Sequence, residues 1–168
     1  HLAANDPDRF LAIAPSAGWE SFDAYGGPRP RSMLDALWHG ADGASQTLSL
    51  VTNLAPLPTF VLHGTKDDNV PLSQAETMLK ALRDAGGKPE SHFQEGAGHW
   101  WDGDAAPGAD CVDWPAIFEL FDRTEPQVPT TFDWTTVDPA VDASHHWVAV
   151  TQPAAREVLP ADRQRLAV

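Results

Sequence analysis

Two residues of this chain have the types and the spacing of an acid–base pair. Asp67 lies in a polar loop after the β-rich run 58–63, and His99 lies in a second loop after the short run 90–95. In open α/β sheets functional side chains occupy loops at the carboxyl ends of strands, so both could reach one crevice. A carboxylate that accepts the Nδ1 proton of an imidazole fixes its tautomer and stabilises the imidazolium formed when histidine takes a proton from serine. The spacing therefore indicates nucleophilic catalysis, with Asp68 as the nearest rival for the acid role.

The elements that must position this pair alternate between strands and helices. The helix after the acid loop is predicted to begin with a capping box of Ser73 and Glu76 and to end at the glycines 86–87. The sequence pattern predicts further elements at other segments: a buried strand at 10–14, helices at 33–38 and 112–121, and strands at 130–136 and 145–150. Strands that alternate with helices predict the α/β class, with a parallel sheet and crossover helices.

The chain is expected to divide at a linker over residues 124–130, which is polar and contains two prolines. Residues 1–123 hold the α/β pattern, and residues 131–168 have the β-branched and aromatic content of strands. Two or three strands in about 38 residues are too few for a stable sheet of their own. This short β-rich tail is therefore expected either to begin a further β domain or to pack on the α/β part.

The charge of the chain disfavours some classes of partner. The 168 residues include 11 Lys and Arg against 24 Asp and Glu, a formal net charge of −13, and no basic cluster interrupts the acidic excess. Such a chain repels phosphates, which disfavours nucleic acid. No apolar run approaches the roughly 20 residues of a membrane span, and no signal peptide is visible. The lone Cys111 cannot form an internal disulfide, so the compartment stays open, a secreted or periplasmic location included.

The same side chains predict neither a metal site nor a cofactor site. A hydrolytic metal centre built from His63, Asp67, His99 and Asp102 is disfavoured, because His-x-x-x-His or a comparable ligand spacing is absent. No cofactor and no metal are therefore expected.

The acid loop also carries a family resemblance. The sequence His-Gly-Thr-Lys-Asp-Asp-Asn-Val over residues 63–70 resembles the acid loop of the prolyl oligopeptidase and dipeptidyl-peptidase group of α/β-hydrolases, where a His-Gly-x-x-Asp-x-x-Val pattern carries the catalytic aspartate. Gly98-His99 is similar to the loop that supplies the family's histidine, and the opening of the chain is similar to the segment after the nucleophile elbow. The resemblance covers roughly residues 1–123 and implies a partial α/β-hydrolase fold, with Asp67 as acid and His99 as base.

The nucleophile of such a hydrolase is missing from the sequence. No Gly-x-Ser-x-Gly occurs in the 168 residues, and the nearest match is Ala-Pro-Ser-Ala-Gly around Ser16. A nucleophile elbow needs a strand, a tight turn and a helix, whereas Ser16 precedes a loop rich in Gly and Pro and follows Pro15, which has no N–H. The chain is therefore expected to be the C-terminal part of a hydrolase whose N-terminal half is absent.

The sequence favours a serine hydrolase of the prolyl-oligopeptidase-like kind that acts by acyl transfer on a peptide or ester, the chain alone being inactive. In this interpretation Trp100 and Trp101 are candidates for an acyl or P1-type pocket, with packing as the alternative. A carboxylesterase or depolymerase-like hydrolase is the other enzyme hypothesis, because one fold hosts many chemistries. Outside enzymes, the alternative is a non-catalytic module that binds carbohydrate or protein through its Trp-rich loops and acidic surface.

Overall fold

Two parallel strands lie at the centre of the molecule. Strand β1 (Phe60–Gly64) pairs with β2 (Glu90–Gln94), with the first residues of the two strands opposite each other. The computed structural model describes the chain except residues 22–23, 26–42, 138, 140–141, 152–163 and 168. The helix predicted at 33–38 lies outside the described residues.

A third segment lies along β1 on the side away from β2. The Ile13 amide donates to the Pro58 carbonyl, and the Ile13 carbonyl accepts the Phe60 amide, both at 3.0 Å. The Leu62 amide donates to the Pro15 carbonyl at 3.0 Å. Proline has no N–H, so one hydrogen bond of this ladder is missing and the pairing is reduced to isolated parallel bridges. The strand predicted at 10–14 is therefore present in interrupted form, and β1 lies between two parallel neighbours.

Helix α5 (Leu72–Asp84) connects β1 to β2 and covers one face of the sheet. Val61 of β1 packs there against Ala75 and Leu79 of the helix, with Phe93 of β2 beside them. The resulting strand–helix–strand unit is the crossover expected between parallel strands.

The two ends of α5 differ in how well the sequence predicts them. The helix begins directly after Pro71, so Ser73 lies inside its first turn and cannot take the N-cap position; the predicted capping box is wrong. The C-terminal stop is confirmed, because Gly86 has a φ of 90° and the Gly87 amide donates to the Leu82 carbonyl at 2.8 Å.

Two helices cover the opposite face of the sheet, where the sequence predicts one helix over 112–121. Helix α6 (Asp110–Asp113) ends just before Trp114, and α7 (Pro115–Arg123) begins with Pro115. A proline disfavours helical conformation in the residue before it, and Trp114 has a ψ of 126°. The single predicted helix is therefore broken at this proline.

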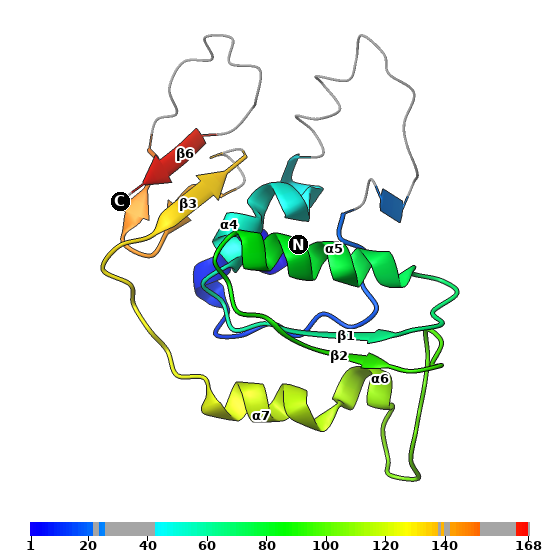
Figure 1. Cartoon of the computed structure of the whole chain (residues 1–168). Helices are drawn as coiled ribbons and strands as arrows, with labels where there is room; N and C mark the ends of the chain where they lie inside the picture. Colours follow the sequence, from blue (N-terminus) through cyan, green and yellow to red (C-terminus); the bar gives the residue numbers. More distant parts are fainter. Residues whose placement is uncertain (22–23, 26–42, 138, 140–141, 152–163, 168) are drawn as a thin grey trace, which may run out of the picture.

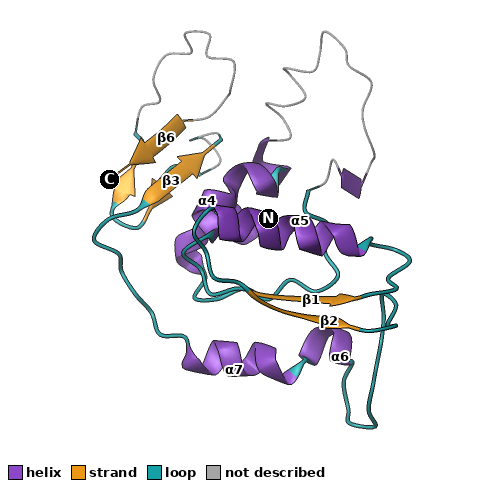
Figure 2. Cartoon of the chain, viewed as in Figure 1, coloured by secondary structure: helices purple, strands orange, loops and turns teal. Residues whose placement is uncertain are grey.

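The sheet is the middle layer of three, with α5 on one side and α6 and α7 on the other (Figures 1 and 2). Side chains alternate along β1, as they do in any strand: Phe60 and Leu62 join Ile117 and Leu120 of α7 in one buried cluster, while Val61 faces α5. All five residues of β1 are buried. This arrangement has the predicted α/β class, with a parallel sheet and a crossover helix.

Short helices from two distant parts of the chain pack beside the sheet. They are α1 (Leu2–Asn5), the 3₁₀ turns η1 (Pro7–Arg9), η2 (Gly43–Ser45) and η3 (Thr47–Leu50), and α4 (Val51–Leu54). Their apolar side chains form a buried cluster with Leu82 of α5. The other buried members of this cluster are Ala3, Ala4, Leu50 and Leu54.

The described part of the tail forms small antiparallel pairs. They are β3 (Asp133–Thr136) with β6 (Gln164–Ala167), and β4 (Ser144–His145) with β5 (Val148–Ala149). The strand predicted at 130–136 is confirmed in β3. The segment 145–150 is not one strand, because the chain turns at His146, which has a φ of 49°.

One asparagine connects the tail to the α/β part. The side chain of Asn53 in α4 donates to the carbonyls of Ala4 and Thr135, both at 2.8 Å, and accepts the Thr135 amide at 2.9 Å. Trp134, next to this contact, is 1% exposed. The described tail therefore packs on α4, which lies beside β3 in Figure 1, and Val137 of the tail packs against the buried cluster that α1 and α4 share.

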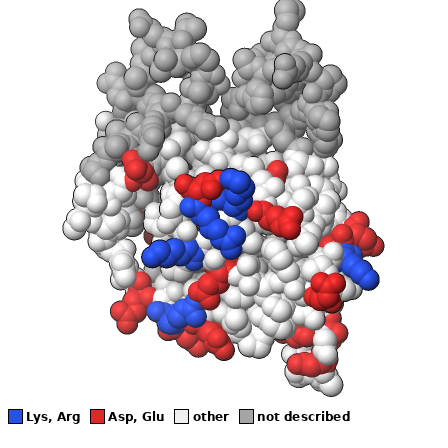
Figure 3. All heavy atoms as spheres, viewed as in Figure 1, with Lys and Arg blue, Asp and Glu red and all other residues white. Residues whose placement is uncertain are grey.

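On the face shown in Figure 3, basic side chains lie beside acidic ones. Lys80 pairs with Asp84 on α5, and Arg123 pairs with Glu90. None of the described helices has the length and the apolar composition that crossing a membrane requires.

Candidate active site

The acid loop begins where β1 ends. The amide of Asp67 donates to the Gly64 carbonyl at 3.2 Å, which closes a turn. Oδ1 of Asp67 then accepts the amides of Asn69 at 2.9 Å and Val70 at 2.8 Å. The Asp67 side chain is 0% exposed. These hydrogen bonds hold the carboxylate in one orientation inside its own loop.

His99 reaches this carboxylate from the loop after β2. Its Nδ1 lies 2.9 Å from Oδ2 of Asp67, and its side chain is 17% exposed. An ionised carboxylate only accepts hydrogen bonds, so Nδ1 carries the proton and Nε2 remains available to accept another. Asp68, the rival for the acid role, is exposed. The structure thus brings Asp67 and His99 together, while their catalytic role stays a prediction.

Direct backbone contact holds the acid loop and the histidine loop together. The Lys66 amide donates to the Ala97 carbonyl at 2.8 Å, and the Thr65 hydroxyl accepts the Gly96 amide at 2.8 Å. A Cβ at Gly64 would lie 2.4 Å from the Ala97 carbonyl oxygen, so only glycine permits this approach. Sequence reasoning missed the role of Thr65, since its partner lies in a loop 31 residues away.

The surroundings of Asp67 favour its ionised form. Burial alone would raise the pKa of this carboxyl, but hydrogen bonds from the Val70 amide, from His99 and from the Asn69 amide outweigh burial and leave the pKa below its usual value. Asp67 is therefore a carboxylate at neutral pH. A carboxylate in this position can orient an imidazole and stabilise its protonated form.

The two tryptophans after His99 have different surroundings. Trp100 is 75% exposed, and its ring lies edge-on to the His99 ring with centroids 5.1 Å apart. Trp101 packs against the buried cluster of β1 and α7, and its ring lies 5.7 Å from that of Trp114. Trp100 thus borders the imidazole, whereas packing accounts for the place of Trp101. A substrate-binding role stays a prediction for both.

Ser16 does not have the surroundings of a nucleophile elbow. Its hydroxyl donates to the carbonyl of Cys111 in α6, and its backbone forms a parallel bridge with Leu62. The Ala17 amide continues this pairing with a 2.9 Å hydrogen bond to the Leu62 carbonyl. Ser16 therefore continues the interrupted third strand and connects it to α6, rather than opening a helix at a tight turn.

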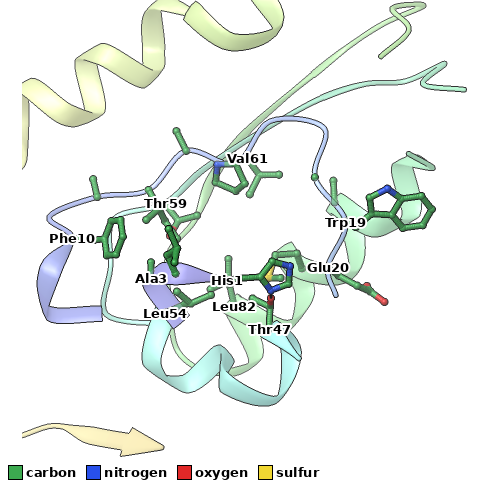
Figure 4. A pocket seen from close by; sticks show the side chains of 18 of the residues that line it. His1, Ala3, Phe10, Trp19, Glu20, Thr47, Leu54, Thr59, Val61 and Leu82 are labelled. Atoms are coloured by element: carbon green, nitrogen blue, oxygen red, sulfur yellow. Dashed lines mark hydrogen bonds between the residues drawn. The ribbon is translucent and has the colours of Figure 1, made fainter. Parts of the chain in front are cut away.

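A cavity of about 550 Å³ lies on the α5 side of the sheet. Figure 4 shows Phe10 toward one end of it, Trp19 and Glu20 toward the other, and His1 between them. Its described lining includes His63 but neither half of the Asp67–His99 pair. The cavity is therefore separate from the candidate active site, although one buried side chain lies next to both.

The described residues contain one group of three acidic side chains close enough to share a metal ion, in the loop before α6 and at the first residue of that helix. Its members are Asp102, Asp104 and Asp110. All three carboxylates accept loop amides: Asp110 from Gly103 and Asp104 from Ala106, both at 2.6 Å, and Asp102 from Asp104 at 3.3 Å. These hydrogen bonds account for the acidic residues as part of the loop's own structure, and the group does not include His63, Asp67 or His99.

Curated proteins with similar sequences are much longer than this chain. An uncharacterised secreted protein of Arthroderma benhamiae is 33% identical over 108 residues, which cover 58% of this chain and 11% of that protein. Dipeptidyl peptidase 4 of Bos taurus is 34% identical over 82 residues, which cover 45% of this chain and 10% of that protein. The chain thus spans about a tenth of the length of these relatives.

Solved structures share the fold at low sequence identity. Acylaminoacyl peptidase in complex with Z-Gly-Gly-Phe-chloromethyl ketone matches with a TM-score of 0.53 and 18% identity, over 77% of this chain and 22% of that chain. The uncomplexed acylaminoacyl peptidase of Pyrococcus horikoshii matches with a TM-score of 0.51 and 18% identity, over 77% and 23%. The family model for the prolyl oligopeptidase family matches residues 2–110, which include both loops of the site. The chain therefore belongs to the prolyl oligopeptidase family, and its layers are part of an α/β-hydrolase fold.

Proposed function

We propose that this chain supplies the acid, Asp67, and the base, His99, of a serine peptidase whose nucleophile comes from a segment outside these 168 residues. The observation that carries the proposal is the 2.9 Å contact between the buried Asp67 carboxylate and Nδ1 of His99, at the carboxyl ends of two adjacent parallel strands. The family membership supports the proposal, because the family is named for a peptidase and the relative from Bos taurus is a dipeptidyl peptidase.

The chemistry assigned to the two residues is acyl transfer. Nε2 of His99 takes the proton of the serine hydroxyl as the oxygen attacks the scissile carbonyl, and Asp67 stabilises the imidazolium that results. The imidazolium then gives its proton to the leaving amine, which departs as the acyl-enzyme forms. In the second half His99 takes a proton from the attacking water and returns it to the serine. Asp67 stays ionised throughout, which its lowered pKa supports.

The proposed substrate class, a peptide, is inferred from the family, because the cavity described above is lined by neither Asp67 nor His99. Ester hydrolysis runs through the same acyl-enzyme, so a carboxylesterase is the alternative enzyme. In either case Trp100, exposed beside the imidazole, is a side chain that could contact the acyl or P1 part of a substrate.

The test uses the longer protein that contains this chain and the proposed serine. His99→Gln is expected to lower kcat for a peptide p-nitroanilide by about 10⁴-fold or more, since it removes the general base. The matched control is His92→Gln, an imidazole on β2 that bonds to Gln94 and stacks on Trp114. Activity toward p-nitrophenyl esters without any toward p-nitroanilides would favour the esterase. Full activity of His99→Gln would contradict the proposal. No activity of the unmodified protein toward either class of substrate would favour a binding module.

A further inference from the structure

The buried side chain of His63, the last residue but one of β1, lies against the acid loop. It is 1% exposed, and its Nε2 lies 2.9 Å from the Val70 carbonyl oxygen. A carbonyl only accepts, so Nε2 must carry the proton. The other ring nitrogen, Nδ1, is buried and has no hydrogen-bond partner among the described residues. The hydrogen bond to Val70 therefore fixes one tautomer and one orientation of this ring.

His63 contacts both Asp67 itself and Val70, one of the residues that bind its carboxylate. Val70, whose carbonyl it binds, donates its own amide to Oδ1 of Asp67 at 2.8 Å. Nε2 of His63 also lies 3.4 Å from Oδ2, the oxygen that faces His99. The His63 imidazole thus binds Val70, which in turn binds Oδ1 of Asp67. The same imidazole lies next to Oδ2.

We propose that His63 is a positioning residue for Asp67: its Nε2–H anchors Val70 and fills the space beside Oδ2, so that the carboxylate stays aimed at His99. This inference rests on the proposed function, because it assigns a task within that same acid–base pair. His63 touches neither the substrate nor the reacting atoms, and it acts only through Asp67 and Val70.

The position requires both a donor and bulk. An apolar ring here would leave the buried Val70 carbonyl without a partner, and an unsatisfied buried acceptor is costly enough to rearrange a short loop. A small side chain would open space toward the cavity that His63 also lines, next to Oδ2. Either change would let the carboxylate turn away from the imidazole, and a misplacement of about 1 Å can cost up to about 10²-fold in rate.

The first test needs no substitution and uses the 168-residue chain. A long-range ¹H–¹⁵N spectrum distinguishes the two neutral tautomers of each histidine. The expected result is a His63 ring protonated at Nε2 and not at Nδ1. The opposite tautomer would overturn the inference, because Nε2 could not then donate to Val70.

The second test follows the Asp67 carboxyl by ¹³C NMR in variants of the same chain. His63→Phe keeps a ring but loses the donor, and it is expected to move the Asp67 titration upward in pH, since the Val70 hydrogen bond that lowers the pKa of Asp67 is disturbed. His63→Gln, which can place an amide N–H near the lost Nε2–H, is expected to restore most of the difference. His92→Phe is the matched control on β2 and should leave the Asp67 titration unchanged.

The third measurement separates a failure of this inference from a failure of the proposed function. In the longer active protein, His63→Phe is expected to lower kcat by about 10- to 100-fold with KM nearly unchanged, and His63→Gln to recover most of it. If Asp67→Asn abolishes turnover while His63→Phe changes neither turnover nor the Asp67 titration, the positioning role is wrong and the proposed function stands. If His63→Phe moves the Asp67 titration but Asp67→Asn leaves turnover intact, the proposed function is wrong.

Discussion

Asp67 and Asp68 are neighbours of the same type, yet their surroundings differ completely. The Asp67 side chain is buried, accepts two backbone amides and faces an imidazole, whereas Asp68 is exposed. Burial with matched donors allows a carboxylate to orient a partner, because it has only one orientation available. These surroundings favour Asp67 over Asp68 for the proposed acid role, and a substitution can separate the two.

In the longer protein, Asp67→Asn is expected to keep the fold and to lower kcat by about 10⁴-fold. The amide would offer an N–H where Nδ1–H needs an acceptor, so His99 would take the wrong tautomer. Asp68→Asn is the control and should change kcat by less than about threefold, since its side chain contacts solvent. Steady-state rates on one substrate suffice, and equal losses in the two variants would show that the acid is misassigned.

The sequence was sufficient to predict which two residues meet, because the loops that follow adjacent parallel strands must meet at one sheet edge. It could not predict how His63 binds Val70, since that contact depends on the path of the chain between them. Nor could it distinguish Trp100 from Trp101. The two residues are of the same type, and they differ in exposure because only the Trp101 ring packs against the buried cluster of β1 and α7.

At the scale of elements, one glycine joins the acid loop to the histidine loop. A Cβ at Gly64 would lie 2.4 Å from the carbonyl oxygens of Ala97 and Gly98, which are backbone atoms that cannot rotate away. Gly64→Ala is therefore expected to lower the free energy of unfolding by about 1–3 kcal/mol and to weaken the Asp67–His99 contact.

Gly98→Ala is the matched control for this substitution. A Cβ at Gly98 would meet nothing within 4 Å. Gly98→Ala should therefore lower the free energy of unfolding by less than about 1 kcal/mol, as is usual for substitutions at uncrowded sites. Urea unfolding of both variants measures the difference. Similar midpoints for the two would mean that the loops separate easily, and that the close approach at Gly64 does not stabilise the site.

Prolines explain three of the places where the structure differs from the predicted elements. Pro15 removes one donor from the third strand, and Pro115 breaks the helix predicted over 112–121. Pro71 lets α5 begin one residue before Ser73, so the predicted capping box has no function there. Buried strands such as β1 are easier to predict, because a continuous apolar run between turn signals has few other solutions.

For the whole molecule, the 168-residue chain alone is expected not to react with a fluorophosphonate probe. It has no Gly-x-Ser-x-Gly, and the hydroxyl of Ser16 is donated to the Cys111 carbonyl. Intact-mass spectrometry after labelling checks this, with the longer active protein as the positive control. Stoichiometric labelling of Ser16 would contradict both this expectation and the proposed origin of the nucleophile.

The contact between the tail and the N-terminal helices should depend on pH. Burial, and then repulsion from Asp6, raise the pKa of Asp142 to about 6, above its value in an unfolded chain. The folded state therefore favours the protonated carboxyl, and its stability falls as pH rises from about 4 toward 6.

Asp142→Asn removes this penalty, because an amide cannot ionise. The variant is expected to be more stable than the unmodified chain at pH 8, by about 1–3 kcal/mol, and nearly equal to it at pH 4. Urea unfolding followed by tryptophan fluorescence at the two pH values measures this, since Trp134 is buried in the same contact. A variant that is less stable than the unmodified chain at pH 8 would show that the ionised carboxylate is stabilising.

The packing of the tail on the α/β part also has a consequence for the order in which the chain folds. Asp67 and His99 are 32 residues apart, whereas Asn53 and Thr135 are 82 apart and Asp8 and His146 are 138 apart. Closing the longest of these loops costs about 1 kcal/mol more entropy than closing the shortest. The acid–base pair is therefore expected to form with the β1–α5–β2 unit, before the tail docks. In pulsed hydrogen exchange during refolding, the amide of Val70 should become protected earlier than that of Thr135.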